Sequence, residues 1–473
     1  MTYAANHLAH ALRANFSPDQ PFIYGARPLT YEAFWQGALR LAAALEIAPG
    51  DRVAMQVEKS VEALQLYLAT VLAGGIILPL NPDYTRAETQ YFLEDATPRV
   101  FVTPMPEGWP VPRALTMEAL VAEGRDGFEP VARGPEDLAA ILYTSGTTGR
   151  SKGAMLSHRA LASNAQILQT AWRFTADDTL IHALPVFHTH GLFVATNVAL
   201  MAGASLEFMA KFNADDIIAA MPRATALMGV PTFYTRLLKD DGLAQAAANM
   251  RLFISGSAPL LASTHQEWQA QTGHTILERY GMTETNMNTS NPYDGERRAG
   301  TVGLPLAGVE LRIDAPEGEI GGIEVRGDNV FSGYWNMPEK TAEELRPDGW
   351  FITGDLGQLD ADGYVTIVGR GKDLIISGGF NVYPKEVEEV LDALPQILET
   401  AVIGLPDADL GEKVVAVVVL KKDMNEAAVL DAACKSLARY KCPREIHFLE
   451  ALPRNTMGKV QKIVLRQRFE TLS

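Results

Sequence analysis

A loop rich in glycine and hydroxyl residues is the part of the sequence best suited to chemistry. The segment YTSGTTGRSKG occupies residues 143–153 and follows an apolar run at 138–142, which predicts a loop leaving a buried strand. Glycines let successive backbone N–H groups point into one concavity, while hydroxyl groups, Arg150 and Lys152 add donors and positive charge. This composition favours a polyphosphate site over a flexible linker, because linkers seldom follow a buried strand directly. It is not a Walker loop, since Lys152 is followed by a glycine.

The loop resembles the phosphate-binding signature of the adenylate-forming superfamily, which includes acyl-CoA synthetases, luciferases and the adenylation domains of peptide synthetases. Further segments resemble the motifs of this superfamily, in the same order, as far as residue 462. They are PVFHTHG (185–191), SGSAPL (255–260), ERYGMTET (278–285), GWFITGDLG (349–357), GRGKDLIISGGFNVYPKEVE (369–388) and PRNTMGKVQK (453–462). Because coincidence does not plausibly give so many motifs in one order, the sequence is identified as a member of the superfamily.

The resemblance implies a two-step reaction that uses ATP and coenzyme A. A carboxylate attacks the α-phosphate of ATP, giving an acyl adenylate and pyrophosphate, and the thiol of coenzyme A then displaces AMP. Negative charge builds up on phosphate oxygens in the first step, so catalysis requires cations and oriented donors. By resemblance, the residues that bind ATP or AMP are Thr144, Ser145, Gly146, Thr147, Thr148, Gly149, Lys152, Gly256, Ser257, Ala258, Pro259, Tyr280, Gly281, Met282, Asp355 and Arg370.

The resemblance assigns catalytic roles to Lys459, Thr283 and Glu284. Lys459 follows a glycine just before the last expected helix, so its ammonium can stabilise charge on the α-phosphate; a solvated lysine is the alternative. Thr283 resembles a contact with that phosphate. Glu284 resembles the carboxylate that holds Mg²⁺ against the phosphates, although an acid here can also begin a helix. A lysine acyltransferase acting on Lys459 would remove the charge that adenylation needs, which makes regulation at this residue a hypothesis.

Other roles implied by the resemblance concern the nucleoside and coenzyme A. Asp355 and Arg370 resemble the pair that binds the ribose hydroxyls, and Tyr280 resembles the ring that stacks on adenine. Without the motifs, an aspartate in a turn and a tyrosine in a mixed run are more often structural. In the last part of the chain, the resemblance implies a hinge at Lys372 and contacts with the pantetheine arm at Gly378 and Gly379.

Two arginines in the acyl-binding part of the chain suggest a substrate with a second carboxylate. Arg279 precedes YGMTE, and Arg236 in PTFYTRLL has apolar neighbours that predict a face turned inward. An arginine walled by apolar groups is costly to bury unless an anion meets it, and its planar fork matches a carboxylate. In the alternative interpretation, Arg236 pairs with an internal acid such as Glu278 or Asp240.

These segments resemble malonyl-CoA synthetases in particular. The resemblance is carried by ERYGMTETNMNTSNPYDGERRAGTVG (278–303), PVFHTHGLFVA (185–195) and GGFNVYPKEVE (378–388). It implies malonate as the acid, with methylmalonate as a slower substrate, in a pocket lined by His188, Asn286 and Met287. Three alternatives stay open: a ligase for another short-chain or aryl carboxylic acid, an adenylation enzyme that loads a carrier protein, and a non-catalytic binder with the same fold.

Short apolar runs that alternate with helical patterns predict an α/β fold. Residues 60–73 have apolar residues at helical spacing, and residues 138–143, 180–184, 226–230 and 252–255 are short apolar runs. Such a pattern is typical of mostly parallel sheets flanked by helices. Beyond about residue 300, closely spaced glycines and β-branched residues predict a small β-rich subdomain.

The chain is expected to divide near residue 370. Residues 1–369 would form an N-terminal adenylate-forming domain with the ATP and acyl pockets, and residues 370–473 a small, mobile α+β lid domain carrying the catalytic lysine. In the lid, helices are expected at 384–393, 426–439 and 460–469, and strands near 400–405 and 414–420.

The composition is that of an acidic globular protein. The 473 residues include 41 Lys and Arg against 57 Asp and Glu, a net charge of −16. This surplus argues against binding to nucleic acid or an anionic membrane, which depends on clustered Lys and Arg. No secretory signal and no apolar stretch long enough to cross a bilayer is visible, so a cytoplasmic protein is expected. Cys434 and Cys442 are expected to be free thiols, as in a reducing compartment.

Overall fold

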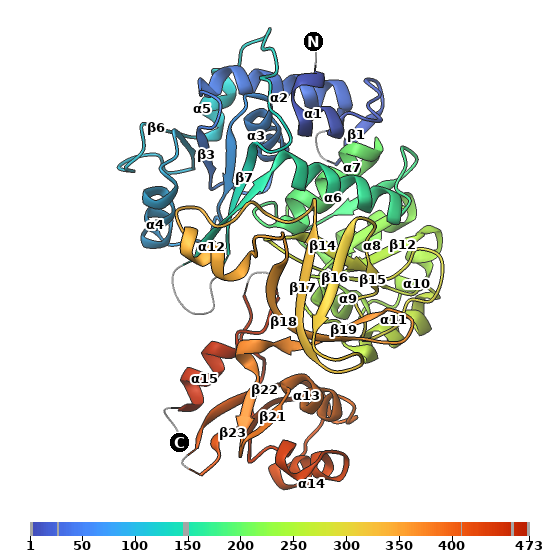
Figure 1. The fold of residues 1–473 in the computed structure, drawn as a ribbon. Helices are drawn as coiled ribbons and strands as arrows, with labels where there is room; N and C mark the ends of the chain where they lie inside the picture. The colour runs from blue at the N-terminus through green and yellow to red at the C-terminus, as the bar shows by residue number, and fades with distance from the viewer. Residues whose placement is uncertain (1–2, 26–27, 145–150, 408, 456–457, 471–473) are drawn as a thin grey trace.

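The computed structural model describes residues 3–25, 28–144, 151–407, 409–455 and 458–470 (Figure 1). Three sheets formed before residue 371 lie in the upper part of Figure 1, and a fourth sheet, formed by later residues, lies below them. No helix within these described ranges is long and apolar enough to span a membrane.

The largest sheet has nine strands in the described chain. Its central strands pair in parallel, and antiparallel pairs form only at its two edges. Its central strands are short buried apolar runs, as expected for strands covered on both faces. In spatial order, the strands are β15 (Leu304–Pro305), β14 (Asn286–Ser290), β13 (Leu277–Met282), β12 (Leu252–Ser255), β11 (Ala226–Gly229), β9 (Thr179–His182), β10 (Ser205–Phe208), β1 (Pro21–Tyr24) and β2 (Leu29–Thr30).

A second sheet, with six strands among the described residues, carries the loop recognised in the sequence between its last two strands. Its pairs are parallel except for the hairpin of β7 and β8. In spatial order, the strands are β6 (Arg113–Leu115), β5 (Val100–Val102), β3 (Arg52–Met55), β4 (Ile76–Pro79), β7 (Leu138–Thr144) and β8 (Lys152–Ser157).

Helices connect these strands, and several begin at a side chain that accepts a backbone N–H of the first turn. Thr85 and Glu88 form a reciprocal capping box at one such start. The α-helices are α1 (His7–Leu12), α2 (Tyr31–Leu45), α3 (Val61–Leu72), α4 (Arg86–Ala96), α5 (Met117–Ala122), α6 (His158–Ala171), α7 (Asn197–Ala202), α8 (Ala214–Ala220), α9 (Pro231–Leu237), α10 (Leu243–Ala246) and α11 (Ala262–Thr272). Shorter helical segments are η1 (Tyr3–Ala5), the π-helix η2 (His190–Thr196), η3 (Met221–Arg223) and η4 (Ala247–Asn249).

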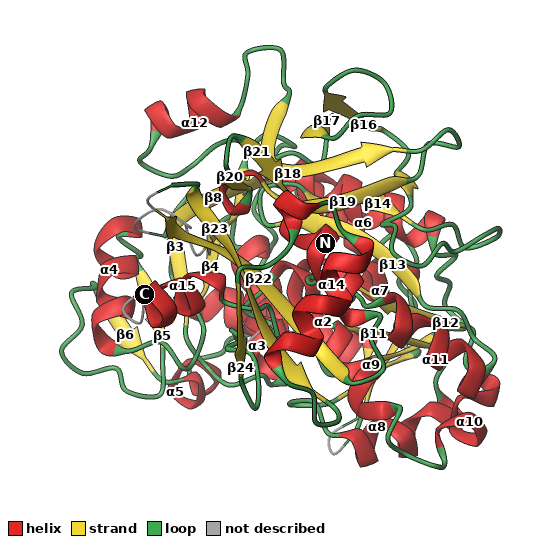
Figure 2. Ribbon diagram, turned by 90° about the horizontal axis from the view of Figure 1, so that it is seen from below, coloured by secondary structure: helices red, strands yellow, loops and turns green. Residues whose placement is uncertain are grey.

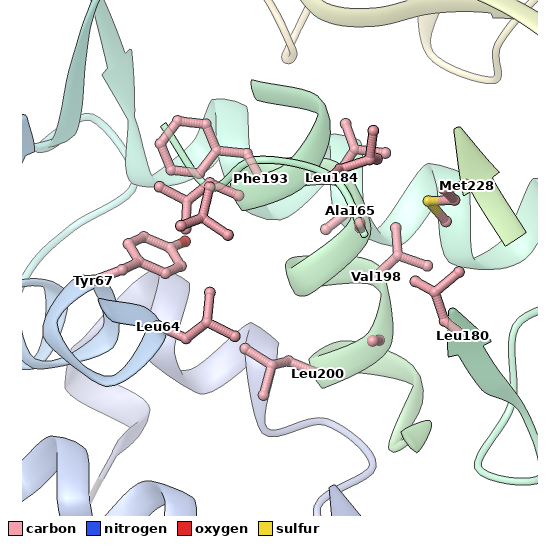
Figure 3. Close-up of a cluster of buried hydrophobic side chains, with 14 of the residues drawn as sticks. Leu64, Tyr67, Ala165, Leu180, Leu184, Phe193, Val198, Leu200 and Met228 are labelled. Atoms are coloured by element: carbon pink, nitrogen blue, oxygen red, sulfur yellow. The ribbon is translucent and has the colours of Figure 1, made fainter. Parts of the chain in front are cut away.

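The main core lies between the helices and the two parallel sheets. Figure 3 shows Leu64 and Tyr67 of α3 beside Phe193 of η2. The Tyr67 and Phe193 ring centroids are 5.5 Å apart, and the Tyr67 hydroxyl donates to Asn197 Oδ1 at 3.0 Å. This core fixes η2, which includes the last two residues of the segment 185–191 and therefore helps to position it.

A four-stranded antiparallel sheet forms the β-rich part of the described chain and ends at Arg370. Its strands are β16 (Val309–Asp314), β17 (Gly321–Gly327), β18 (Phe351–Leu359) and β19 (Val365–Arg370), and helix α12 (Pro338–Glu344) lies between β17 and β18.

The last sheet has five strands in the described residues and a core on each face. Figure 2 views the molecule from the side of this sheet. Ile375 and Val402 belong to one core with residues of α13 and α14, while Ile403 and Val417 belong to the other with Leu465 of α15. The elements are η5 (Gly371–Asp373), β20 (Ile375–Ser377), β21 (Phe380–Val382), α13 (Pro384–Asp392), β22 (Ile397–Asp407), β23 (Gly411–Leu420), α14 (Glu426–Ser436), η6 (Arg439–Lys441), β24 (Glu445–Phe448) and α15 (Lys462–Glu470).

The expected α/β class, with parallel sheets, a β-rich part and a small α+β part, is confirmed. Two local expectations differ. The helix expected to reach Arg439 ends at Ser436, and the last helix starts at Lys462, because Val460 instead forms an isolated bridge with Arg454.

The expectation of two free thiols is wrong. Cys434 in α14 and Cys442 after η6 are joined as a disulfide, with their Cα atoms 5.4 Å apart. The chain turns back through η6, which brings the second cysteine beside the helix that carries the first.

Replacing Leu64 by alanine tests the main core. The side chain is fully buried, so the substitution removes apolar contacts and leaves a cavity, and we expect the free energy of unfolding to fall by about 2 to 5 kcal/mol in denaturant titrations. Val121→Ala, at a residue 44% exposed, is the control and should change stability by less than about 0.5 kcal/mol. Equal effects of the two substitutions would contradict this description of the core.

Candidate active site

The candidate site lies where parallel strands of the nine-stranded sheet end. Strands β9, β11, β12 and β13 run parallel beside one another, so their carboxyl ends meet at one edge, which is where α/β sheets bind ligands. The segment 185–191 follows β9, α9 follows β11, residues 256–260 follow β12, and residues 283–285 follow β13. The fold therefore brings three of the motifs recognised in the sequence to a common edge.

A polar cluster centred on Asp355 joins this edge to the four-stranded sheet. The Tyr280 hydroxyl donates to Asp355 Oδ2 at 2.6 Å, and Arg370 Nε lies 2.7 Å from Asp355 Oδ1. Burial, and then the neighbouring carboxylate, raise the pKa of Tyr280 well above its ordinary value, so the phenol keeps its proton and remains a donor. A carboxylate and a guanidinium held side by side suit a vicinal diol, which needs both an acceptor and a donor.

A second cluster surrounds Glu284 in the turn after β13. The Tyr334 hydroxyl lies 3.0 Å from Glu284 Oε1 and 2.6 Å from Glu344 Oε2. Lys152 Nζ lies 3.1 Å from Glu344 Oε2 and 4.1 Å from the centroid of the Tyr334 ring. Burial raises the pKa of Glu284, which means that the surrounding protein does not fully compensate its charge. A cation beside Glu284 would stabilise the ionised carboxylate.

The ends of the glycine-rich loop are held together by the β7–β8 hairpin. Thr144 and Lys152 are Cα partners across the pair, and the Thr144 hydroxyl donates to the Lys152 carbonyl at 3.5 Å. The remaining loop residues proposed from the sequence lie outside the described residues: Ser145, Gly146, Thr147, Thr148 and Gly149.

Arg279 is buried close to Gly256. A Cβ added at Gly256 would lie 2.4 Å from Arg279 Cζ, so a side chain there would displace the guanidinium. Nε and Nη2 of Arg279 have no hydrogen-bond partner within the described chain, and burial lowers the pKa of this arginine to about 9. Two unused donors on a buried cation form a site that an anion would complete.

His190 and Ser257 lie beside this arginine. Ser257 Oγ is 3.2 Å from His190 Nδ1, while His190 Nε2 lacks a partner among the described residues. Burial, and then the charge of Arg279, lower the pKa of His190 well below its ordinary value, so the ring is neutral. When Ser257 donates to Nδ1, the proton on Nε2 is a further buried donor without a partner among the described residues.

Arg236 is not turned inward, contrary to the expectation from its apolar neighbours. It is exposed on α9, and its guanidinium carbon lies 5.4 Å from the centroid of the Phe212 ring. Phe233 and Leu237, one turn apart, are buried, and Arg236 lies at the edge of the face that they share. The structure therefore gives the two arginines different surroundings, one buried and one open to solvent.

The other expected pocket residues lie beside the strand that carries Arg279. His188 is partly buried, and burial lowers its pKa to about 4, so its ring is neutral. Asn286 and Met287 begin β14 and are buried. The side-chain amide of Asn164 donates to the Met287 carbonyl and accepts the Met287 N–H. The remaining expected site residues that lie at least partly open to solvent at this edge are Ala258, Pro259, Gly281, Met282 and Thr283.

Lys459 reaches the Asp355 cluster from the C-terminal part of the chain. Its residue remains open to solvent, yet partial desolvation and then the charge of Arg370 lower its pKa, while Asp355, Asp373 and Glu284 oppose this shift. The ammonium therefore lies close enough to these four groups to interact with their charges, so a phosphate bound beside them could also interact with it.

Close backbone approach positions the turn that carries Lys459. Gly458 has a φ of 75°, and a Cβ added there would lie 3.3 Å from Thr232 Oγ1 in α9. Asn455 accepts the Lys459 N–H at 2.9 Å, and Arg454 Nη1 donates to the Gly458 carbonyl at 2.6 Å. The two hydrogen bonds fix the turn itself, and its glycine lies against α9 of the larger part of the molecule.

The three remaining expected positions are exposed. Lys372 lies in η5, two residues after Arg370. Gly378 and Gly379 form the turn between β20 and β21, with φ angles of 58° and 81°. A left-handed backbone at both glycines explains their residue type independently of any ligand.

Comparison with known proteins identifies the class. The sequence profile of AMP-binding enzymes matches residues 11–335, and that of the AMP-binding enzyme C-terminal domain matches residues 386–459. The chain therefore belongs to the AMP-binding enzyme family.

Particular relatives include two ligases with different substrates in their names. The malonate–CoA ligase of Arabidopsis thaliana is 34% identical over 482 residues, covering 89% of this chain and 78% of that protein. The sulfoacetate–CoA ligase of Cupriavidus necator is also 34% identical, over 495 residues and 96% of each chain. Among solved structures, ATP-bound MatB from Rhodopseudomonas palustris is 54% identical and matches with a TM-score of 0.95 over 99% of both chains. The apo form of MatB, at the same identity and coverage, matches with a TM-score of 0.84.

The sequence analysis missed two residues of the Glu284 cluster, Tyr334 and Glu344. Tyr334 lies between recognised motifs, in SGYWN, and its backbone bridges to Ala154 of β8. Glu344 ends α12, where an acidic residue gives no sequence signal of its own. Their places follow only from the packing of residues 333–344 on the β7–β8 hairpin.

The buried Glu278, on the strand that carries Arg279, gives a pH-dependent prediction. Its Oε1 accepts the Leu260 N–H at 3.2 Å, and burial raises its pKa to about 7. Folding therefore favours the protonated form of Glu278. The contribution of this residue to the free energy of unfolding is complete below the ordinary carboxyl pKa and is lost as the pH rises through 7. We expect Glu278→Gln, which keeps the acceptor, to raise the free energy of unfolding at pH 8 by up to about 3 kcal/mol.

The measurement compares denaturant unfolding of the variant and the unaltered protein from pH 5 to pH 8. The difference between them should grow with pH, whereas Glu267→Gln, at an exposed position on α11, should give a flat difference. A difference for Glu278→Gln that is independent of pH would refute the raised pKa.

Proposed function

We propose that the protein is an ATP-dependent malonate–CoA ligase. One malonate carboxylate attacks the α-phosphate of ATP and pyrophosphate leaves; the thiol of coenzyme A then attacks the malonyl carbonyl and AMP leaves. The observation that carries the choice of a dianionic acid is the buried Arg279, whose Nε and Nη2 are unpaired in the described chain at the edge where the nucleotide motifs meet. The malonate–CoA ligase and MatB relatives support the same acid.

In this proposal, each polar cluster binds one part of the nucleotide. Asp355 and Arg370 hold the ribose hydroxyls, Tyr280 stacks on adenine, and Lys152 with Thr144 and the adjoining loop binds the phosphates. Glu284 would hold Mg²⁺, which would supply positive charge to neutralise the phosphates. The raised pKa of Glu284 fits a carboxylate that awaits such a cation, and Thr283 would contact the α-phosphate.

The acyl pocket would hold the second carboxylate away from the reacting one. Arg279, with His190 and Ser257 beside it, supplies donors for the unreactive carboxylate, and the exposed Arg236 assists from α9. His188, Asn286 and Met287 would line the rest of the pocket. Methylmalonate keeps both carboxylates and adds one methyl group, so we propose it as a slower substrate.

We further propose that residues 370–473 form a mobile lid with its hinge at Lys372. Support comes from the separate cores on the two faces of the last sheet, because such a unit can move without exposing its interior. The higher TM-score with ATP-bound than with apo MatB supports the interpretation that the present arrangement serves adenylation, with Lys459 at the α-phosphate. In the second step, Gly378 and Gly379 would contact the pantetheine arm of coenzyme A.

The substrates of the proposed reaction also suggest where the protein works and how it could be regulated. ATP and coenzyme A are intracellular substrates, so we propose a cytoplasmic location. A lysine acyltransferase could inactivate the enzyme at Lys459, whose exposed ammonium would become a neutral amide. The leading alternative is a ligase for another short dianionic acid, favoured by the sulfoacetate–CoA ligase relative of equal identity.

Replacing Arg279 by methionine tests the acid. The variant should lose about 100-fold in kcat/KM for malonate, because the unreactive carboxylate loses its buried partner, whereas Arg236→Ala should lose about 10-fold since Arg236 is exposed. AMP release is measured with malonate, methylmalonate, sulfoacetate, acetate, octanoate and coumarate. Turnover of octanoate or coumarate that equals or exceeds that of malonate would overturn the proposal, and a preference for sulfoacetate would favour the alternative.

Replacing Lys459 by alanine separates the two half-reactions. Loss of its charge should slow malonate-dependent pyrophosphate exchange by about 10²- to 10³-fold. Release of AMP from synthetic malonyl adenylate by coenzyme A should stay within about twofold of the unaltered protein, because that step does not need the ammonium at the α-phosphate. Lys435→Ala, on the exposed face of α14, is the control and should leave both rates unchanged. Equal losses in both half-reactions would contradict the assigned role.

A further inference from the structure

The ammonium of Lys152, at the end of the proposed phosphate loop, is occupied by a carboxylate of the protein itself. Lys152 Nζ lies 3.1 Å from Glu344 Oε2 and 3.2 Å from Glu344 Oε1, so it faces both oxygens. The side chains are only 19% and 22% exposed, which shields the pair from solvent more than a surface ion pair. Glu344 therefore holds the position at Lys152 that a phosphate oxygen would take.

Two further groups hold Glu344 in this position. The Tyr334 hydroxyl lies 2.6 Å from Glu344 Oε2, and Lys340 Nζ, one turn earlier on α12, lies 2.9 Å from Glu344 Oε1. Lys340 lies on the same helix as Glu344 and therefore stays beside the carboxylate when it leaves Lys152, whereas the backbone of Tyr334 is bridged to β8. When a phosphate oxygen takes the place of Glu344 at Lys152, Glu344 thus keeps Lys340 as a partner.

The single proton of Tyr334 links this exchange to Glu284. Its hydroxyl lies within hydrogen-bond distance of both Glu284 Oε1 and Glu344 Oε2, but it has only one proton to donate. If Glu284 is engaged by a cation on the phosphates, the proton is left for Glu344. A cation at Glu284 therefore leaves the Tyr334 hydrogen bond to Glu344, which offsets part of the loss of Lys152 as a partner.

We propose that Glu344 is the resting counter-ion of Lys152, and that the β- and γ-phosphates of ATP displace it. This inference rests on the proposed function, in which the loop beside Lys152 binds the polyphosphate. The phosphates must break the ion pair with Glu344 to reach Lys152, so part of the binding energy of ATP is spent on that displacement. AMP has no β- or γ-phosphate and leaves the pair intact. Glu344 thus weakens the affinity for ATP and not that for AMP.

The test measures the Kd of Mg-ATP and of AMP by calorimetry, without the acid substrate, so that no reaction follows. We expect Glu344→Gln to bind Mg-ATP at least threefold more tightly and AMP within twofold of the unaltered protein. Glu343→Gln is the matched control: it removes an adjacent charge that contacts Lys340 and not Lys152, so both affinities should stay unchanged. Thermal unfolding of each variant shows whether α12 still packs.

A double-mutant cycle with Lys152→Gln shows whether the effect acts through the pair. In that background, Glu344→Gln should no longer change the Kd of Mg-ATP. Weaker binding of Mg-ATP by Glu344→Gln would overturn the proposal, because Glu344 would then orient Lys152 for the phosphates. An equal change for Mg-ATP and AMP, or an unchanged effect in the Lys152→Gln background, would also overturn it. Failure of the unaltered protein to bind Mg-ATP would instead refute the proposed function.

Discussion

The carboxylate of Asp355 is the interaction on which the arrangement of the site depends. One oxygen accepts the Tyr280 hydroxyl from the nine-stranded sheet, and the other meets Arg370, the last residue of the four-stranded sheet. Arg370 in turn precedes the segment that leads to the last sheet and acts on the charge of Lys459. Two sheets therefore meet at one buried acid, and the chain leads to the last sheet directly after the arginine that contacts it.

Cations in this protein are buried or crowded where anions are expected to bind. Arg279 has a pKa lowered to about 9 by burial, and Lys459 shares its surroundings with Arg370. Positive groups held close together without full compensation are unfavourable in the empty protein. An enzyme that binds a polyphosphate and a diacid recovers this free energy on binding, which explains how an acidic protein, with a net charge of −16, can bind several anions.

Much of the fold and of the site could be predicted from the sequence, because both depend on patterns of residues that are close together in the chain. The short apolar strands and the motif order predicted the parallel sheets and brought Tyr280, Asp355 and Arg370 to one cluster. Arg236 was misjudged because the apolar residues near it do not bury it: Phe233 and Leu237 of α9 face the core, while Arg236 lies at the edge of that face and is open to solvent. The contact of Glu344 with Lys152 joins residues 192 positions apart, and the Cys434–Cys442 disulfide depends on the turn through η6. Neither leaves a local pattern.

The two cores of the last sheet have a consequence for its neighbours. Because helices cover both faces of β22 and β23, the apolar residues of the two cores are buried within this unit. Its contacts near the site are made by polar groups and a glycine turn, such as Lys459 beside the Asp355 cluster and Gly458 beside Thr232. Polar surfaces exchange protein partners for water at little net cost. Where it meets the site, the C-terminal unit is therefore joined to the rest of the enzyme by groups that water can also solvate, although apolar side chains such as Ile376, Phe380 and Ile463 are exposed on the same unit.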